Sequence, residues 1–224
     1  QEKYLPKPDA MHNKEDRPHR SEDDPDEPWT VLLNRHWELK DLNELPTLYR
    51  KVYNGLYVFG SSTGPRIDPG ELSLFSMAEN IDIDVAEGRG FAAKALFNRI
   101  ASKVPPEKKM RLSHFHYASP GELGIFVDHA TAIALSDAVG SFLKGNGEDR
   151  YWALYRERHR DEDEQSNHEI DQLAQRLCPL IHIDWARVSQ AFPVTETRPD
   201  YILAQARYTM GLAKFLRKGM VQAY

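Results

Sequence analysis

The sequence predicts an α+β fold: a small, mainly antiparallel sheet with helices packed on one face, followed by an α-helical C-terminal part. Two observations lead to this prediction. In the first two thirds of the chain, short stretches that alternate apolar and polar residues lie among longer stretches with apolar residues at helical spacing. After residue 148, helical spacing dominates. Strands and helices mixed in this order form an α+β layer rather than a doubly wound sheet, and 41% hydrophobic residues among 224 suffice for a core.

Residues 1–28 are predicted to form a flexible acidic arm. They hold nine Asp and Glu against five Lys and Arg, five prolines and almost no bulky apolar side chains. Such a segment buries too little surface to offset the entropy lost on ordering. The whole chain has a net charge of −5, so the rest of it carries only −1. Because that part lacks the clustered cations that nucleic acid requires, nucleic-acid binding is not expected.

The α+β part is predicted over residues 29–147. It begins with a strand over 30–39, which is rich in β-favouring and apolar residues. Asp41 or Asn43 is expected to cap the following helix, with Pro46 in its first turn. Apolar residues at helical spacing predict one buried face on this helix, formed by Leu45, Leu48, Tyr49, Val52, Leu56 and Phe59.

The rest of this part follows from alternation, glycines and prolines. The motif IDIDV alternates strictly and predicts a strand, and the apolar stretch after it predicts a helix that Pro105-Pro106 stops. The stretch RLSHFHYASPGELGIFVDHA predicts a β-hairpin that turns at Ser119-Pro120-Gly121, and Asp128 is expected to cap the next helix. The predicted ranges are 81–85, 111–117 and 123–127 for the strands and 91–104 and 129–143 for the helices.

The hairpin also resembles a known element. HYASPGELGIFVD is similar to a strand–YxSPG–strand element of uncharacterised bacterial proteins, in which a helix follows as it does here. The likeness covers residues 95–143. It implies a bacterial origin and the hairpin itself, and it implies no activity and no site residues.

The helical part is predicted over residues 148–224 and is expected to pack on the α+β part. Residues 156–169 contain no apolar side chain, so a solvated helix and a loop both fit them. Asp184 is expected to cap a helix that starts after it. The sequence from Thr197 to Asp200 has the form of a capping box and predicts a last helix over 201–218.

Alternation also indicates a candidate metal centre. Side chains two residues apart in a strand share a face, so Asp82 lies with Asp84 and His114 with His116. If the two strands are neighbours, two carboxylates and two imidazoles converge. That donor set suits Zn²⁺, Mn²⁺ or Fe²⁺ and can activate a water for hydrolysis. The alternative, which we favour, is a solvated sheet face, because no H-E-x-x-H or C-x-x-C motif accompanies these residues.

Three other motifs have weaker chemical interpretations. Ser119 is a candidate nucleophile beside His114 or His116, but turn formation explains Ser-Pro-Gly equally well. The glycine-rich stretch 60–64 lacks the Gly-Lys-Ser/Thr of a phosphate-binding loop. Cys178 is the only cysteine, which excludes an internal disulfide, and its helical apolar surroundings predict a buried side chain.

An aromatic cluster opens the helical part. Tyr151, Trp152 and Tyr155 either pack the helical part onto the sheet layer or bind a partner, because aromatic side chains dominate the anchors of protein interfaces. We therefore retain all three as candidate partner-binding residues.

Without a strong catalytic signature, the sequence favours a bacterial accessory protein of the cytoplasm that binds another protein. A homo-oligomer is compatible with this prediction. No cofactor is expected, and enzymatic activity is an open question. No apolar run approaches the roughly 20 residues of a membrane span, so no membrane association is expected.

Two alternative functions remain at this point. The first is a metal-dependent hydrolase, resembling a phosphodiesterase or nuclease, that uses a divalent metal held by Asp82, Asp84, His114 and His116. The second is a small-ligand or nucleotide-sensing domain that uses the loop over 60–70.

Overall fold

The structure is a computed structural model. It describes residues 28–34, 37–60, 64–65, 67, 93–116, 121–160, 166–192, 197–218 and 221–223. Within these ranges the α+β half contains β1 (Trp29–Leu33), α1 (Leu39–Phe59), α2 (Ala93–Lys103), the 3-10 turn η4 (Pro106–Lys108), β2 (Arg111–His116), β3 (Gly121–Phe126) and α3 (His129–Leu143). The C-terminal half contains α4 (Asn146–Arg158), α5 (Asn167–Leu177), the 3-10 turn η6 (Cys178–Ile181), α6 (Trp185–Ala191), α7 (Thr197–Arg217) and β4 (Val221–Ala223).

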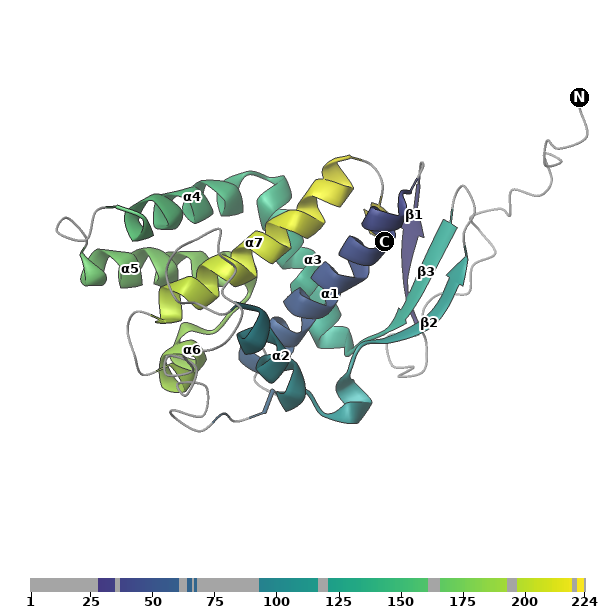
Figure 1. Cartoon of the computed structure of the whole chain (residues 1–224), viewed down its shortest axis with the longest axis horizontal. Coiled ribbons are helices and arrows are strands. Elements are labelled where there is room, and N and C mark those ends of the chain that lie inside the picture. Colours follow the sequence, from purple (N-terminus) through teal and green to yellow (C-terminus); the bar gives the residue numbers. More distant parts are fainter. Residues whose placement is uncertain are drawn as a thin grey trace, which may run out of the picture.

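The four described strands form one antiparallel sheet in the order β2-β3-β1-β4. Figure 1 shows this sheet on one side of the molecule and the helices on the other. Val31 and Leu123 lie opposite each other in the register and are both buried in the main hydrophobic cluster beneath the sheet. The predicted fold class, an α+β fold with a helical C-terminal part, is confirmed.

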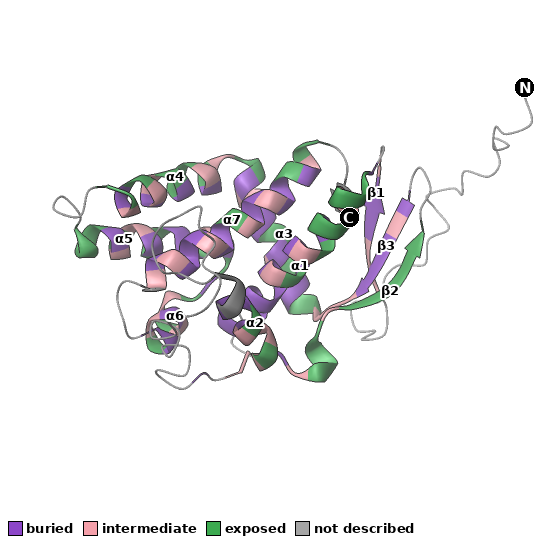
Figure 2. Ribbon diagram, viewed as in Figure 1, coloured by how far each residue is buried: buried purple, intermediate pink, exposed green. Residues whose placement is uncertain are grey.

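The core is continuous across the two parts of the chain. Phe59, at the end of α1, is 1% exposed, and its ring centroid lies 5.0 Å from that of Tyr201 in α7 and 5.9 Å from that of Phe192. The six residues predicted as the buried face of α1 are all buried (Figure 2). The boundary expected between residues 147 and 148 stays a prediction, since this shared cluster neither places nor excludes it.

Two helix starts differ from the sequence prediction. The backbone N–H of Glu38 donates to the Asp41 carboxylate at 3.1 Å, so α1 begins at Leu39 and Pro46 lies inside the helix rather than in its first turn. Helix α7 begins at Thr197, and Asp200 accepts hydrogen bonds from Arg158 at 2.8 and 3.2 Å. Helix α7 thus starts four residues before the predicted residue 201, and the capping box expected from Thr197 to Asp200 stays a prediction.

Two predicted helix caps are confirmed, whereas the boundaries of several other elements differ from the prediction. Asp128 caps α3 and Asp184 caps α6, each through a backbone N–H two or three residues later, as expected. The stretch 156–169 is not one helix, because α4 ends at Arg158 and α5 begins at Asn167. Strand β1 ends at Leu33, earlier than expected, and β4 was not predicted. The expected strand over 81–85 lies outside the described residues.

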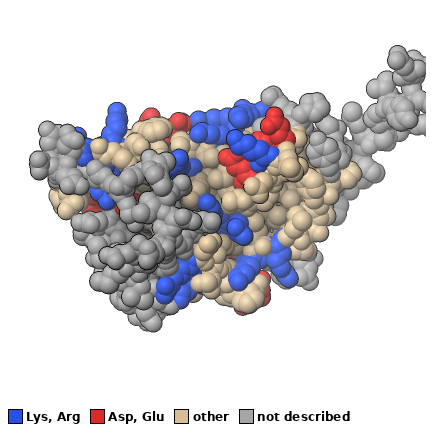
Figure 3. All heavy atoms as spheres, viewed as in Figure 1, with Lys and Arg blue, Asp and Glu red and all other residues tan. Residues whose placement is uncertain are grey.

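None of the described helices combines the length and the apolar character needed to cross a bilayer. Figure 3 shows Lys and Arg side chains scattered over the visible face, with Asp and Glu beside several of them.

Candidate functional site

Strand β2 is much more exposed than the strand it pairs with. All six of its residues are exposed, whereas four of the six residues in the neighbouring strand β3 are buried (Figure 2). β2 lies at one end of the strand order, so among the described strands only β3 pairs with it. The described part of the chain places no strand on the outer side of β2, which is the position where a sheet can accept a further strand.

A β-bulge decides which side chains of β2 point to which face. Leu112 pairs with Ile125 and His114 with Gly124, so Ser113 is an extra residue in the ladder. Because paired residues share a face, the bulge puts Leu112 and Phe115 on the same side of the sheet, the side that β3 turns toward the helices. Without the bulge, these two residues would point to opposite faces.

Leu112 and Phe115 form an exposed apolar patch on this side of β2. They are 63% and 44% exposed, whereas their cross-strand neighbours Ile125 and Leu123 are 5% and 6% exposed. The helices thus cover β3 but leave the same face of β2 open, which agrees with the position of β2 beyond the helical layer in Figure 1. We call Leu112 and Phe115, together with the outer edge of β2, the β2 edge surface.

The two histidines lie on the opposite, outer face of the sheet. The His114 ring lies over Gly124, where an added Cβ would overlap it, and His114 Nε2 is 3.9 Å from Glu122 Oε2. His116 pairs with Glu122 in the register, so His114 and His116 share a face, as alternation predicts. The His114 and Glu122 side chains are each more than 40% exposed, so their attraction is weak.

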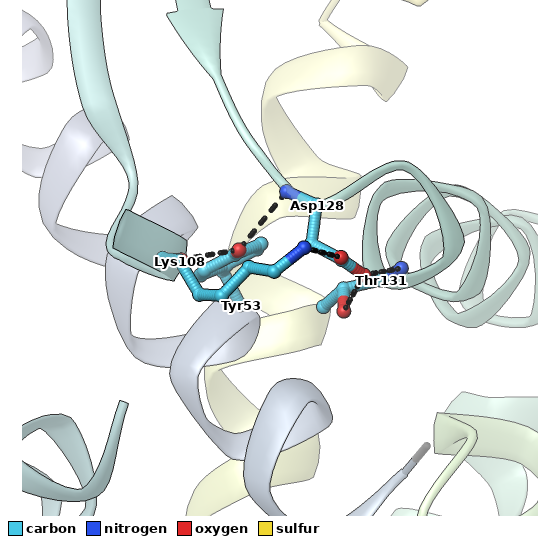
Figure 4. A network of polar contacts seen from close by, with 4 residues as sticks. All are labelled: Tyr53, Lys108, Asp128 and Thr131. Carbon is cyan, nitrogen blue, oxygen red and sulfur yellow. Dashed lines mark hydrogen bonds and ion pairs between the residues drawn. The ribbon is translucent and has the colours of Figure 1, made fainter. Parts of the chain in front are cut away.

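A buried tyrosine anchors both ends of the hairpin to α1. The Tyr53 hydroxyl donates to the backbone carbonyl of Lys108 at 2.7 Å and accepts from the backbone N–H of Asp128 at 3.0 Å (Figure 4). Lys108 comes shortly before β2 and Asp128 shortly after β3. One hydroxyl therefore fixes where the hairpin leaves and rejoins the helical layer, and with it the direction of β2.

The Asp128 carboxylate completes this anchor. It accepts hydrogen bonds from Lys108 Nζ at 2.9 Å and from the Thr131 N–H and Oγ1 at 3.2 and 3.0 Å (Figure 4). Burial acts to raise the pKa of Asp128, but the bonds from Lys108 and Thr131 outweigh it and hold the pKa below its ordinary value. Burial also raises the pKa of Tyr53 to about 12, so its hydroxyl stays protonated near neutral pH.

The lowered pKa of Asp128 predicts acid sensitivity. A carboxyl group whose folded-state pKa lies below its unfolded value of about 3.9 contributes stability that is complete above that value and is lost as the pH falls through the folded pKa. We expect Asp128→Asn to be less stable than the wild type at pH 7 by about 1 kcal/mol or less, because the Lys108 side chain is 46% exposed.

The variant should also lose less stability than the wild type between pH 5 and pH 2. Urea unfolding at a series of pH values measures both effects. Asp137→Asn, on the exposed side of α3, is the control and should keep the wild-type acid dependence. Parallel stability curves for the wild type and Asp128→Asn would contradict the prediction.

The metal hypothesis stays a prediction. Asp82, Asp84 and Ser119 lie outside the described residues, so their position relative to His114 and His116 is not given. Among the residues that the structure does describe, no three His, Cys, Asp or Glu side chains are grouped so as to hold a metal ion. His129 lies in the first turn of α3, and its ring centroid is 6.3 Å from that of Trp29.

The aromatic cluster on α4 divides between core and surface. Tyr151 is 4% exposed and belongs to the core, whereas Trp152 is 43% exposed. Trp152 meets Tyr155 edge to face at 5.5 Å, and Tyr155 stacks on His159 at 4.0 Å. These aromatic rings form a second exposed candidate surface, and their role in partner binding stays a prediction.

The structure describes the other sequence candidates only in part. Residues 61–63 of the glycine-rich stretch lie outside the described residues. Cys178 is buried as predicted, and burial raises the pKa of its thiol to about 12, which leaves it protonated.

Sequence reasoning missed the two features that define the site. The only signal of the bulge at Ser113 is that two polar residues, Ser113 and His114, stand between the apolar Leu112 and Phe115, which breaks the alternation. The Tyr53 hydroxyl bonds to Lys108 and to Asp128, which follow Tyr53 in the sequence by 55 and 75 positions. The only available signal was Tyr53 itself, a phenol next to the predicted apolar face of α1, since a buried tyrosine hydroxyl usually finds a hydrogen-bond partner.

Comparisons with family models, with curated proteins and with solved structures find no match to this chain.

Proposed function

We propose that this chain is an accessory protein of the bacterial cytoplasm that binds another protein by taking an extended segment of it as a strand beside β2. The observation that carries this proposal is the β2 edge surface, in which the outermost of the described strands exposes two apolar side chains. Added strands gain affinity from main-chain hydrogen bonds and specificity from alternate side chains.

The composition of β2 indicates the chemistry of the partner segment. Residues 108–116 hold three Lys and Arg, two His and no Asp or Glu. On the outer face, Arg111 and His116 would lie beside a strand added at this edge, and on the other face Leu112 and Phe115 would do so. A segment that alternates acidic with apolar residues fits both faces, because cross-strand pairs of opposite charge and of apolar type stabilise a sheet.

The bulge favours a specific partner over indiscriminate pairing. Natural sheets protect open edges with bulges and with charged residues, because flat apolar edges aggregate. β2 has both, with the bulge at Ser113 and a charge at Arg111. A partner strand must accommodate the bulge in its register, which restricts the sequences that bind.

A matched pair of surface variants tests the proposal. Leu112→Asp places a negative charge in the β2 edge surface, and Leu39→Asp makes the same change at an 85% exposed position of α1. The full chain is used to capture proteins from its source cells, and the recovered partner is purified for direct binding measurements. We expect Leu112→Asp to weaken binding at least tenfold and Leu39→Asp to leave it unchanged. Hydrogen exchange of residues 111–116 should slow when the partner is added.

Three outcomes would overturn the proposal. The first is a partner that binds Leu112→Asp as tightly as the wild type. The second is a partner lost only in Trp152→Ser, which would move the docking surface to α4. The third is a self-association in analytical ultracentrifugation that Leu112→Asp abolishes, which would make a second copy of this chain the occupant of the edge.

The metal-dependent hydrolase remains the alternative. It depends on Asp82 and Asp84 meeting His114 and His116. Metal analysis of protein purified without a histidine tag separates the two functions. A stoichiometric divalent metal that His114→Ala removes would favour the hydrolase.

A further inference from the structure

An apolar cavity of about 170 Å³ lies between the sheet and the helices α1, α3 and α7. Its walls are mostly apolar side chains from all of these elements, among them Trp29, Ile125, Leu135, Val139 and Leu212. The cavity lies on the helix side of the sheet, away from the outer face that holds His114 and His116. It therefore lies on the opposite face of the sheet from these two histidines, and its lining residues do not include any of Arg111–His116 in β2.

A glycine in the wall of the cavity has no steric reason to be a glycine. Gly140 lies in the interior of α3, where a Cβ added to it would meet no heavy atom within 4 Å. Its backbone is not in the left-handed region, since Gly145 is the glycine with positive φ among the described residues. Glycine destabilises a helix interior relative to alanine. By contrast, a Cβ on Gly147 would come within 2.8 Å of the Phe142 ring.

The space left open by Gly140 connects to the molecular surface. Two other wall residues of α3 lie partly in solvent: Ser136 is exposed and Leu143 is 41% exposed. A small molecule can therefore reach the cavity along α3. Any longer side chain at position 140 would occupy this path.

The chemistry of the walls selects the ligand. The described residues that line the cavity include no charged side chain. Its two tyrosines, Tyr49 and Tyr53, have pKa values raised to about 12 by burial, so both are neutral. An apolar cavity of about 150 Å³ stays dry and binds benzene. A site of this size and polarity takes a neutral hydrocarbon group and excludes ions, because an ion would lose its hydration without gaining a partner.

From these observations we propose that the cavity is a binding site for a small neutral ligand with an apolar group of about six carbon atoms, such as a phenyl ring or a short alkyl chain. Gly140 keeps the site open. The proposal is independent of protein binding at the β2 edge surface, and either one can fail without the other.

Benzene and n-pentane are the probes that test the site. Methyl resonances of Ile125, Leu135 and Leu212 are followed in the full chain during titration with each probe. We expect saturable shifts of these methyl groups with at least one probe, and the comparison distinguishes a ring from a chain. Gly140→Leu should reduce the affinity at least tenfold and raise the midpoint of thermal unfolding without probe. Asp137→Leu, a leucine added at a position of α3 outside the cavity wall, should bind as the wild type does.

Two results would overturn the proposal. One is the absence of saturable shifts in the wild type with both probes. The other is equal affinity in the wild type and in Gly140→Leu, which would place the probes elsewhere. Gly140→Met serves as a second filling variant if the leucine prevents folding, because its unbranched side chain adapts to irregular space.

Discussion

Replacing Phe59 with alanine is expected to lower the free energy of unfolding by about 3–5 kcal/mol. The Phe59 ring is 1% exposed at the end of α1 and packs against Tyr201 and Phe192, two rings from the C-terminal half of the chain. Its removal leaves a cavity at the place where the two halves share one core. Because the total free energy of unfolding of a domain is only about 5–15 kcal/mol, this single change should remove a large part of it.

Denaturant unfolding measures this loss, with Leu39→Ala as the matched control. Leu39 belongs to the same helix and is 85% exposed, so its truncation should change stability by less than about 0.5 kcal/mol. If the two halves were independent, Phe59→Ala would lower only one of two unfolding transitions. A single cooperative transition that shifts as a whole is the expected result.

Tyr53→Phe is expected to cost about 1–3 kcal/mol although only one oxygen atom is removed. The Tyr53 hydroxyl serves two backbone groups, the carbonyl of Lys108 and the N–H of Asp128. Both lose their partner in a partly buried place, and the desolvation of unpaired groups makes up most of the cost. The hairpin should also open more often at its base, so amide exchange at Asp128 and along β3 should become faster.

Tyr208→Phe is the control for this change. Lys51 Nζ lies over the Tyr208 ring at 4.1 Å, and the Phe97 ring meets it edge to face at 4.9 Å, so both contacts survive loss of the hydroxyl. Its stability should stay within about 0.5 kcal/mol of the wild type. Two results would contradict the anchoring role of Tyr53. One is an equal loss of stability in the two variants, and the other is a loss of stability in Tyr53→Phe without faster amide hydrogen exchange in the hairpin.

Local patterns predicted most of the fold because most of its elements carry local signals. The buried face of α1 follows from helical spacing, and the caps Asp128 and Asp184 follow from single residues before apolar stretches. Strand β4 has only three residues, too few to show a period, and it forms because β1 offers it an edge. The bond of Asp200 to Arg158, 42 residues away, was not predicted because no local pattern reports such a partner.

The candidate site was less predictable for a related physical reason. Alternation correctly predicted that His114 and His116 share a face. It does not predict how far the apolar side chains of the same strand are exposed to solvent. Whether a strand lies at an edge depends on the order of the strands in the sheet, and among the described strands β2 is outermost. The exposure of Leu112 follows from that order and from the bulge, which are both properties of the assembled sheet.

The pairing of β1 with β4 has a consequence for the order in which the protein is made. Leu33 pairs with Val221, so the two strands come from opposite ends of the sequence. At ~5–20 residues per second, synthesis of the chain between them takes ~10–40 s. β3 is made well before β4 and can cover one edge of β1. Until β4 is made, this strand cannot cover the other edge of β1, so that edge of a nascent chain is exposed to mispairing with neighbouring nascent chains on the same mRNA.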